Sequence, residues 1–227
     1  MPDLRQLGSA TAESSSTELF SIGPIRPIHT AVNVVGRRTR RGERGTAIIE
    51  AAITLPLFLM LIFGVMEFGL AFRTYLTTST TTRESTRFAA TLGNAADADY
   101  QIVAKVREMI GAANAGQINT ISIYRATNPN TTTATGALAG CRASSIAGLC
   151  NTYSTSTITA LDVNDFGCGA AAADRYWCPT TRKVRLSDPP DYLGVYISIH
   201  HDDITGIFPL NRDFVDEVVF RLEPVRL

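Results

Sequence analysis

Hydrophobic positions along the chain form one long run followed by shorter periodic stretches. From Ala51 to Met66 no residue carries a charge. Taken over Ala47–Phe72 at about 1.5 Å per residue, a helix here reaches roughly 39 Å, whereas the hydrocarbon core of a bilayer is about 30 Å thick. The run therefore predicts a single N-terminal transmembrane helix, which we place at residues 46–76.

Three other structures could contain such a run. A buried core helix is usually shorter and less uniformly apolar. A cleaved secretory signal has an apolar core of about 7–15 residues that ends in a small-x-small cleavage site, and no such site ends this run. A plain stop-transfer anchor fits the run except at Glu50, because a carboxylate is costly in an apolar segment and indicates a function there.

Helical spacing continues beyond the apolar run. Charged and aromatic residues between Thr74 and Thr91 recur at three- and four-residue intervals, which favours a helix that extends outward to Gly93. A second helix is predicted from Asp99, with Asp97 or Asp99 as its N-cap and Gly111 at its end. Its apolar face consists of Ile102, Val103, Val106, Met109 and Ile110.

Further along the chain the period changes to two. Apolar and polar residues alternate over 118–125, 195–200 and 217–223, which predicts three half-buried strands. With a helix to cover them, these strands make a small antiparallel α+β head over residues 77–227. The long insertion between the first two strands, residues 126–191, shows no periodic element, and a loop of that length in a compact domain is usually functional or mobile.

Charge predicts the topology. Arg37, Arg38, Arg40, Arg41 and Arg44 precede the apolar run, whereas only Arg73 follows it closely. The positive-inside bias therefore places the N-terminus in the cytoplasm and the head outside the cytoplasmic (inner) membrane. Residues 1–45 are predicted to be a disordered basic leader, or an extension from a start codon upstream of the true one. The arginines before the apolar run are explained by their part in setting the topology and by attraction to anionic lipid. The formal net charge of the chain is +0, so nucleic-acid binding is not expected.

All four cysteines lie in the insertion, where an extracytoplasmic location favours disulfides. Of the three possible pairings, we favour Cys141–Cys150 with Cys168–Cys178, because each closes a short local loop. Zinc is the competing interpretation, but a C-x-x-C spacing is missing.

No other chemistry is predicted. His200 and His201 are adjacent in a strand and point to opposite faces, so they are not expected to share a metal ion. The sequence contains no catalytic or nucleotide-binding signature of the common types. We therefore expect no enzymatic activity, no cofactor and no small-molecule substrate.

The start of the apolar run resembles a type IV prepilin processing site, with Gly45-Thr46 followed by Glu50. The resemblance implies that a prepilin peptidase cuts after Gly45 and leaves an α-ammonium on Thr46. An ammonium and a carboxylate attract strongly at low dielectric, and either is penalised when unpaired. Glu50 of the same or a neighbouring subunit would then neutralise Thr46 and set the register of two helices. Many prepilins have Phe or Met at the position of Thr46.

The segment Glu50–Gly69 is similar to the TadE-like family, pilin-related proteins of tight-adherence (Flp-type) pilus systems. The shared positions are Glu50, Pro56 and Glu67-Phe68-Gly69, and residues 80–91 and 218–224 show further resemblance. The resemblance implies a minor pilin, a pseudopilin or another membrane-anchored component of a pilus assembly or secretion system. Its partners would be the lipid bilayer and other assembly proteins, with Glu50, Pro56 and Glu67 acting in helix assembly.

Two expectations remain open. Glu67 is either solvated at the outer headgroups or in contact with another assembly protein. The whole chain could also be a stand-alone membrane-tethered binding module that uses the cysteine-containing insertion for recognition outside the cytoplasm.

Overall fold

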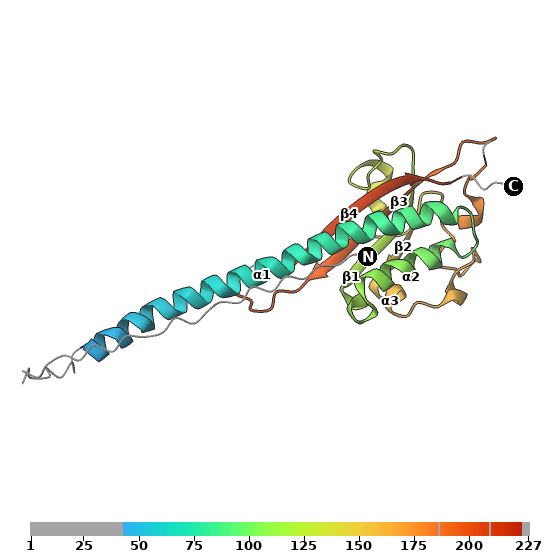
Figure 1. Ribbon diagram of the computed structural model, residues 1–227. Coiled ribbons are helices and arrows are strands. Elements are labelled where there is room, and N and C mark those ends of the chain that lie inside the picture. The colour runs from blue at the N-terminus through green and yellow to red at the C-terminus, as the bar shows by residue number, and fades with distance from the viewer. Residues whose placement is uncertain (1–42, 186, 209, 224–227) are drawn as a thin grey trace, which may run out of the picture. The chain divides into compact units, whose positions relative to one another are not determined.

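The structure is a computed structural model that describes residues 43–185, 187–208 and 210–223 (Figure 1). The chain divides into two compact units, Met1–Ala47 and Ile48–Leu227, and the first unit is described only at its end. The arginines at 37, 38, 40 and 41, most of the predicted leader 1–45, and Pro224 lie outside the described residues. All of the strands and all of the shorter helices belong to the second unit.

The first element, α1, is a helix over Glu43–Leu92 that contains Pro56 without interruption. Proline removes one backbone hydrogen bond, a loss that membrane helices tolerate. The helix ends at Gly93, whose φ of 59° lies in the left-handed region that suits a helix C-terminus. The predicted continuation beyond the apolar run is therefore present, in one unbroken helix.

The C-terminal half of α1 packs on the sheet through small and hydroxyl-bearing residues. Thr78, Thr82 and Thr86 are buried, and each hydroxyl donates a hydrogen bond to the carbonyl oxygen four residues before it, over 2.9, 2.8 and 2.6 Å. A buried hydroxyl without a partner would be costly, so these bonds let the threonines enter the interior. The buried side of α1 also includes Glu67, Ala71, Thr81, Ser85, Ala89 and Ala90.

The second helix, α2, covers Ala98–Ile110 and buries Ile102, Val103 and Val106 completely. Gly111, with a φ of 91°, follows its last residue. Asp97 is at the N-cap position, one of the two predicted, but its side chain makes no capping hydrogen bond and instead accepts from Gln101 Nε2 at 2.7 Å. Asp99 lies inside the helix and is fully buried. Asp99 lies three and four residues before Ile102 and Val103, so helical geometry turns it toward the core.

Four antiparallel strands form one sheet in the order β2-β1-β3-β4. The strands are β1 (Ile118–Ala126), β2 (Cys150–Ser154), β3 (Tyr192–His201) and β4 (Arg212–Arg221). The register places Ile121 of β1 opposite Ile197 of β3, and Ile197 opposite Asp216 of β4. The three predicted strands correspond to β1, β3 and β4, whereas β2 lies inside the insertion, where alternation predicts no strand.

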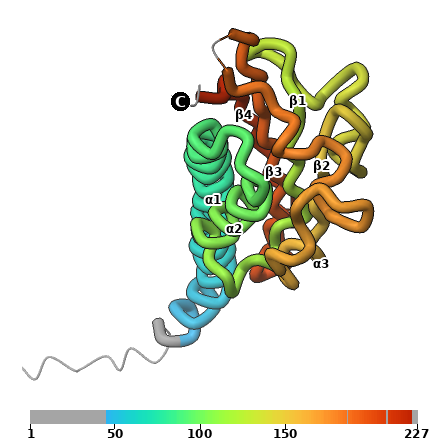
Figure 2. The backbone as a smooth tube through the Cα atoms, turned by 90° about the vertical axis from the view of Figure 1, so that its right-hand side faces the viewer, coloured from blue at the N-terminus to red at the C-terminus, as the bar shows by residue number. Residues whose placement is uncertain are grey.

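Each face of the sheet carries its own core. On one face, Ile121, Ile123 and Ile197 pack with α2 and with Trp177 of the insertion. On the other face, Tyr124 and Tyr196 pack with Leu138 and the Cys141–Cys150 disulfide. Helices α1 and α2 lie together on the first face (Figures 1 and 2). The head is thus an α+β domain with helices on one side of an antiparallel sheet.

The remaining elements are short. They are the 3-10 helices η1 (Ala112–Gln117), η2 (Gly136–Arg142), η3 (Val163–Asp165) and η4 (Pro179–Thr181), and the one-turn helix α3 (Thr155–Thr159). Four of these five elements and strand β2 belong to the insertion. The insertion is therefore a folded part of the head and covers both faces of the sheet, in contrast to the loop without regular elements that its composition predicts.

Candidate assembly helix and its junction with the head

The predicted processing segment lies at the start of α1. Gly45 and Thr46 fall in the first turns of the helix, and a side chain at Gly45 would meet nothing within 4 Å. First-turn residues lack a full set of intrahelical hydrogen bonds, and glycine adds backbone freedom. The Gly45–Thr46 peptide bond lies near the start of the described part of α1. Whether it is cut stays a prediction.

Glu50 and Pro56 lie in the part of α1 that no other element covers. Glu50 is exposed, and its backbone carbonyl accepts a second hydrogen bond, from the Thr54 hydroxyl at 2.9 Å. The apolar side chains around them are largely solvent-facing in the isolated chain: Ile53 is 70% exposed and Leu57 is 73% exposed. An exposed apolar surface of this extent marks a site for membrane or protein contact.

α1 is long and apolar enough to cross a membrane, and no other helix within the described residues is. The most apolar window of α1 is not buried at all by the rest of the chain, which distinguishes it from the core helix of a soluble protein. The structure thus contains one candidate membrane-spanning helix, which fits a single-pass membrane protein and continues into an α+β head.

Glu67 has a different environment from Glu50. Its side chain is completely buried, and its Oε1 accepts hydrogen bonds from the backbone N–H groups of Ile204 and Thr205, at 2.9 and 2.5 Å. These residues belong to the segment Asp202–Asn211, the β3–β4 loop. In the isolated chain, Glu67 is therefore covered by the β3–β4 loop. A part for Glu67 in helix assembly stays a prediction.

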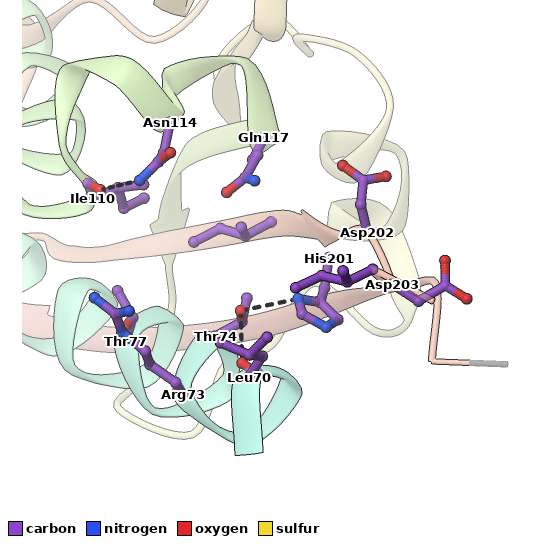
Figure 3. Close-up of a pocket in the computed structure, with 12 residues that line it drawn as sticks. Leu70, Arg73, Thr74, Thr77, Ile110, Asn114, Gln117, His201, Asp202 and Asp203 are labelled. Atoms are coloured by element: carbon purple, nitrogen blue, oxygen red, sulfur yellow. Dashed lines mark hydrogen bonds between the residues drawn. The ribbon is translucent and has the colours of Figure 1, made fainter. Parts of the chain in front are cut away.

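A cavity of about 420 Å³, lined in part by Ile204, lies between α1, η1 and the end of β3 (Figure 3). Arg73 and Thr77 of α1 face Gln117 of η1 across it, and Asp202 and Asp203 lie at one side (Figure 3). His201 Nδ1 is 3.2 Å from the Thr74 hydroxyl, and His201 Nε2 has no hydrogen-bond partner among the described residues.

The adjacent histidines separate as expected. His201 faces α1, whereas His200 Nδ1 lies 2.6 Å from Asp213 of the neighbouring strand β4. The hydrogen bond to Asp213 raises the pKa of His200. Within the described part of the chain, no group of three or more His, Cys, Asp or Glu residues could hold a metal ion.

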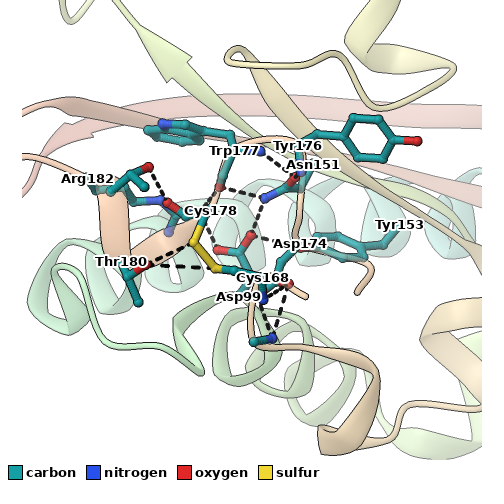
Figure 4. The surroundings of a disulfide bond; sticks show 12 residues. Asp99, Asn151, Tyr153, Cys168, Asp174, Tyr176, Trp177, Cys178, Thr180 and Arg182 are labelled. Atoms are coloured by element: carbon teal, nitrogen blue, oxygen red, sulfur yellow. Dashed lines mark hydrogen bonds and ion pairs between the residues drawn. A yellow bond between two sulfur atoms is a disulfide. The ribbon is translucent and has the colours of Figure 1, made fainter. Parts of the chain in front are cut away.

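The insertion is held to the head by a buried ion pair that the sequence patterns do not predict (Figure 4). Asp99 of α2 accepts a hydrogen bond from Arg182 Nη2 at 2.5 Å, with both side chains fully buried. Asn151 Nδ2 and the Tyr153 hydroxyl donate to its other oxygen, each at 2.8 Å. The Arg182 guanidinium also lies 4.3 Å from the Trp177 ring. One carboxylate therefore joins α2, β2 and the end of the insertion.

Both disulfides are formed, as Cys141–Cys150 and Cys168–Cys178. The first belongs to the core on the second face of the sheet, and the second closes the loop that leads to Trp177 and Arg182 (Figure 4). Glu217 of β4 adds a further tie, because it accepts from the Thr133 backbone and hydroxyl at 2.9 and 2.6 Å. The insertion is thus fixed at several points.

The unpredicted contacts leave partial signals in the sequence. Asp99 shares the helical spacing of the apolar face of α2, which indicates burial and hence a cationic partner. The β3–β4 loop joins two strands through an uncharged stretch, Ile204–Asn211, in which apolar residues predominate. No local signal connects that loop with Glu67, because the two are brought together only by the packing of α1 on the sheet.

Comparison with known proteins agrees with the resemblance noted from the sequence. Residues 45–87 match the sequence model of the TadE family, described as TadE-like protein. The match begins at Gly45 and covers the membrane-anchoring half of α1 and most of its packed half, but not the rest of the head. The match shows similarity to TadE-like proteins over this part of the chain. No curated protein and no solved structure is significantly similar to the chain.

Proposed function

We propose, from the TadE-like match over residues 45–87, that this chain is a minor pilin or pseudopilin of a tight-adherence pilus or related secretion system. The observation that carries the proposal is that the matched segment begins at Gly45 and contains the uncovered apolar half of α1. In this role α1 anchors the subunit in the cytoplasmic membrane with its N-terminus inside. The head then meets other assembly proteins outside.

Glu50 has a specific part in this mechanism. It lies within the first turns of the exposed helix, where a free carboxylate is unfavourable in lipid. After cleavage at Gly45, the Thr46 ammonium of the same or an adjacent subunit would lie within the same layer of the membrane. Pairing of the two charges removes both penalties and fixes the helices in register.

The mature N-terminus tests the processing step. Intact mass and N-terminal sequencing of the protein from its native membrane are expected to give a chain that starts at Thr46. Gly45→Leu is expected to block the cut. Gly69→Leu is a matched control, since a side chain at either glycine meets nothing within 4 Å, and it should be processed normally. A full-length chain with native Gly45 contradicts cleavage.

Association tests the assembly step separately. In Glu50→Ala, co-purification with other pilus proteins is expected to fall while insertion into the membrane is retained. If the chain starts at Met1 and Glu50→Ala associates normally, the data favour a membrane-tethered binding module that acts through the disulfide-linked insertion.

A further inference from the structure

The described residues of the β3–β4 loop, 202–208 and 210–211, run beyond the end of the sheet and along α1 toward the apolar half of that helix (Figure 1). Glu67 fixes the first part of the loop through the N–H groups of Ile204 and Thr205. Phe208 fixes the second part, because its ring lies against Gly64: a Cβ built on this glycine would be 3.0 Å from Phe208 Cζ. The loop therefore follows α1 for about one turn.

The depth of this contact follows from helix geometry. Glu50 and Glu67 are about 26 Å apart along α1 at about 1.5 Å per residue, slightly less than the roughly 30 Å of a hydrocarbon core. Gly64 is about 4.5 Å closer to the membrane centre than Glu67. A bilayer that covers the uncharged run up to Met66 therefore also reaches the level of Phe208.

The surface of the loop is suited to lipid. Ile204 is 66% exposed and Ile207 is 49% exposed, so their apolar side chains point away from the rest of the head. Asp202 and Asp203 are at the root of the loop, and no charged residue follows until Arg212. The loop thus has a charged base next to the head and an apolar outer side beside the membrane helix.

Backbone hydrogen bonding in the loop also fits a nonaqueous environment, in which unsatisfied N–H groups are penalised. Glu67 accepts from two N–H groups, and the Thr205 hydroxyl accepts from Ile207 N at 3.4 Å. The N–H of Leu210 donates to the Phe208 carbonyl at 2.8 Å. Several donors of the loop are therefore satisfied without water.

We propose that the β3–β4 loop inserts into the head-side leaflet of the bilayer next to α1, with lipid acyl chains as its partner and Glu67 as its anchor on the helix. The surface is continuous with the exposed apolar surface of α1, which is the reason to assign lipid as the occupant. The inference needs α1 to span the membrane but requires neither processing nor pilus assembly, so it stands if those steps fail.

Labelling of the full chain in phosphatidylcholine vesicles tests the proposal. The described cysteines are all in disulfides, so Ile207→Cys gives one reactive thiol for a nitroxide or an environment-sensitive fluorophore. Val163→Cys is the matched control, since Val163 is also 49% exposed but lies in η3 of the head. We expect brominated lipids to quench the fluorophore at 207 and oxygen to reach the nitroxide better than a water-soluble nickel chelate, with the opposite result at 163.

Two results overturn the proposal. If positions 207 and 163 behave alike, the loop lies in water. If the label at 207 is shielded from both lipid and aqueous reagents, the loop contacts protein, such as a second copy of the chain.

The anchoring part of the proposal has its own test. Glu67→Ala in the labelled protein is expected to raise nitroxide mobility at 207 and to weaken quenching by at least twofold, whereas Glu67→Gln keeps an acceptor oxygen and retains most of the quenching. Glu84→Ala is a control for the loss of an acidic side chain from the exposed surface of the same helix. Unchanged mobility in Glu67→Ala rejects Glu67 as the anchor.

Discussion

The buried ion pair between Asp99 and Arg182 predicts a large loss of stability in Arg182→Met. Methionine keeps part of the packing on Trp177 but leaves Asp99 buried, charged and bound only by two neutral donors, Asn151 and Tyr153. Removal of one partner from a buried pair typically costs about 3–5 kcal/mol. With a urea m-value of about 2 kcal/mol/M, the unfolding midpoint falls by about 1.5–2.5 M.

The chain offers a direct assay and a control. Trp177 is its single tryptophan, so fluorescence of the full chain in detergent reports on unfolding of the head, with far-UV circular dichroism as a second probe. Lys183→Met removes a neighbouring cation whose ion pair with Asp188 is about half exposed. Because exposed pairs contribute little, this variant should change the free energy of unfolding by less than about 1 kcal/mol.

A double variant separates the pair from its surroundings. Asp99→Asn keeps an oxygen for the Tyr153 hydroxyl but removes the charge, so it should partly rescue Arg182→Met, with a coupling energy of about 1.5–3 kcal/mol. If Arg182→Met loses less than about 1 kcal/mol, or if the two changes are additive, the pair does not hold the insertion to α2 and the reasoning is refuted.

Three further predictions use the same unfolding assay. Gly194→Ala places a Cβ in steric overlap with the Tyr124 ring, and overpacking of this kind costs about 1–3 kcal/mol. A smaller residue at 124 should remove most of this cost. Equal losses of stability with Tyr124 and with the smaller residue would contradict the clash. The hydrogen bond that His200 donates to Asp213 raises the pKa of His200 above 6.5, so the folded state holds this proton more tightly than the unfolded state. The resulting stabilisation is complete below pH 6.5 and is lost as the pH rises through the raised pKa; His200→Asn should flatten this dependence, and an unchanged profile would exclude the contact. Replacement of Cys168 and Cys178 by serines opens a loop with a sequence separation of 10. On the loop-entropy relation this should lower the free energy of unfolding by about 2.5–3 kcal/mol. Reductant should then cause no further loss from this disulfide in the variant.

The periodic pattern of apolar residues predicts those helices and strands that bury only one face. The apolar face of α2 and the alternation in β1, β3 and β4 are visible locally because each element meets the core along one face. The continuation of α1 past the apolar run is also predicted, although its buried face is rich in threonine. Those hydroxyls donate hydrogen bonds to carbonyl oxygens four residues earlier in the same helix. The helix can therefore bury threonines without partners from elsewhere in the chain.

The rest depends on contacts that no local pattern contains. Strand β2 is only Cys150–Ser154, and its extended conformation results from pairing with β1 and from the Cys141–Cys150 disulfide. Glu67 is unusual in the sequence, but its partner is a loop more than a hundred residues later in the chain. Both cases are decided by tertiary packing, which overrides weak local preference.

The unbroken course of α1 has a mechanical consequence. One rigid rod carries both the membrane anchor and the long contact with the sheet, and the roughly 38 Å from Glu67 to Leu92 lies within the head at about 1.5 Å per residue. A pull along the rod is therefore resisted in shear by many contacts at once, from Glu67 to the bond between Glu223 N and Ala90 O. A chain pulled lengthwise by α1 would therefore move with its head folded, whereas a sideways load would break the same contacts one after another.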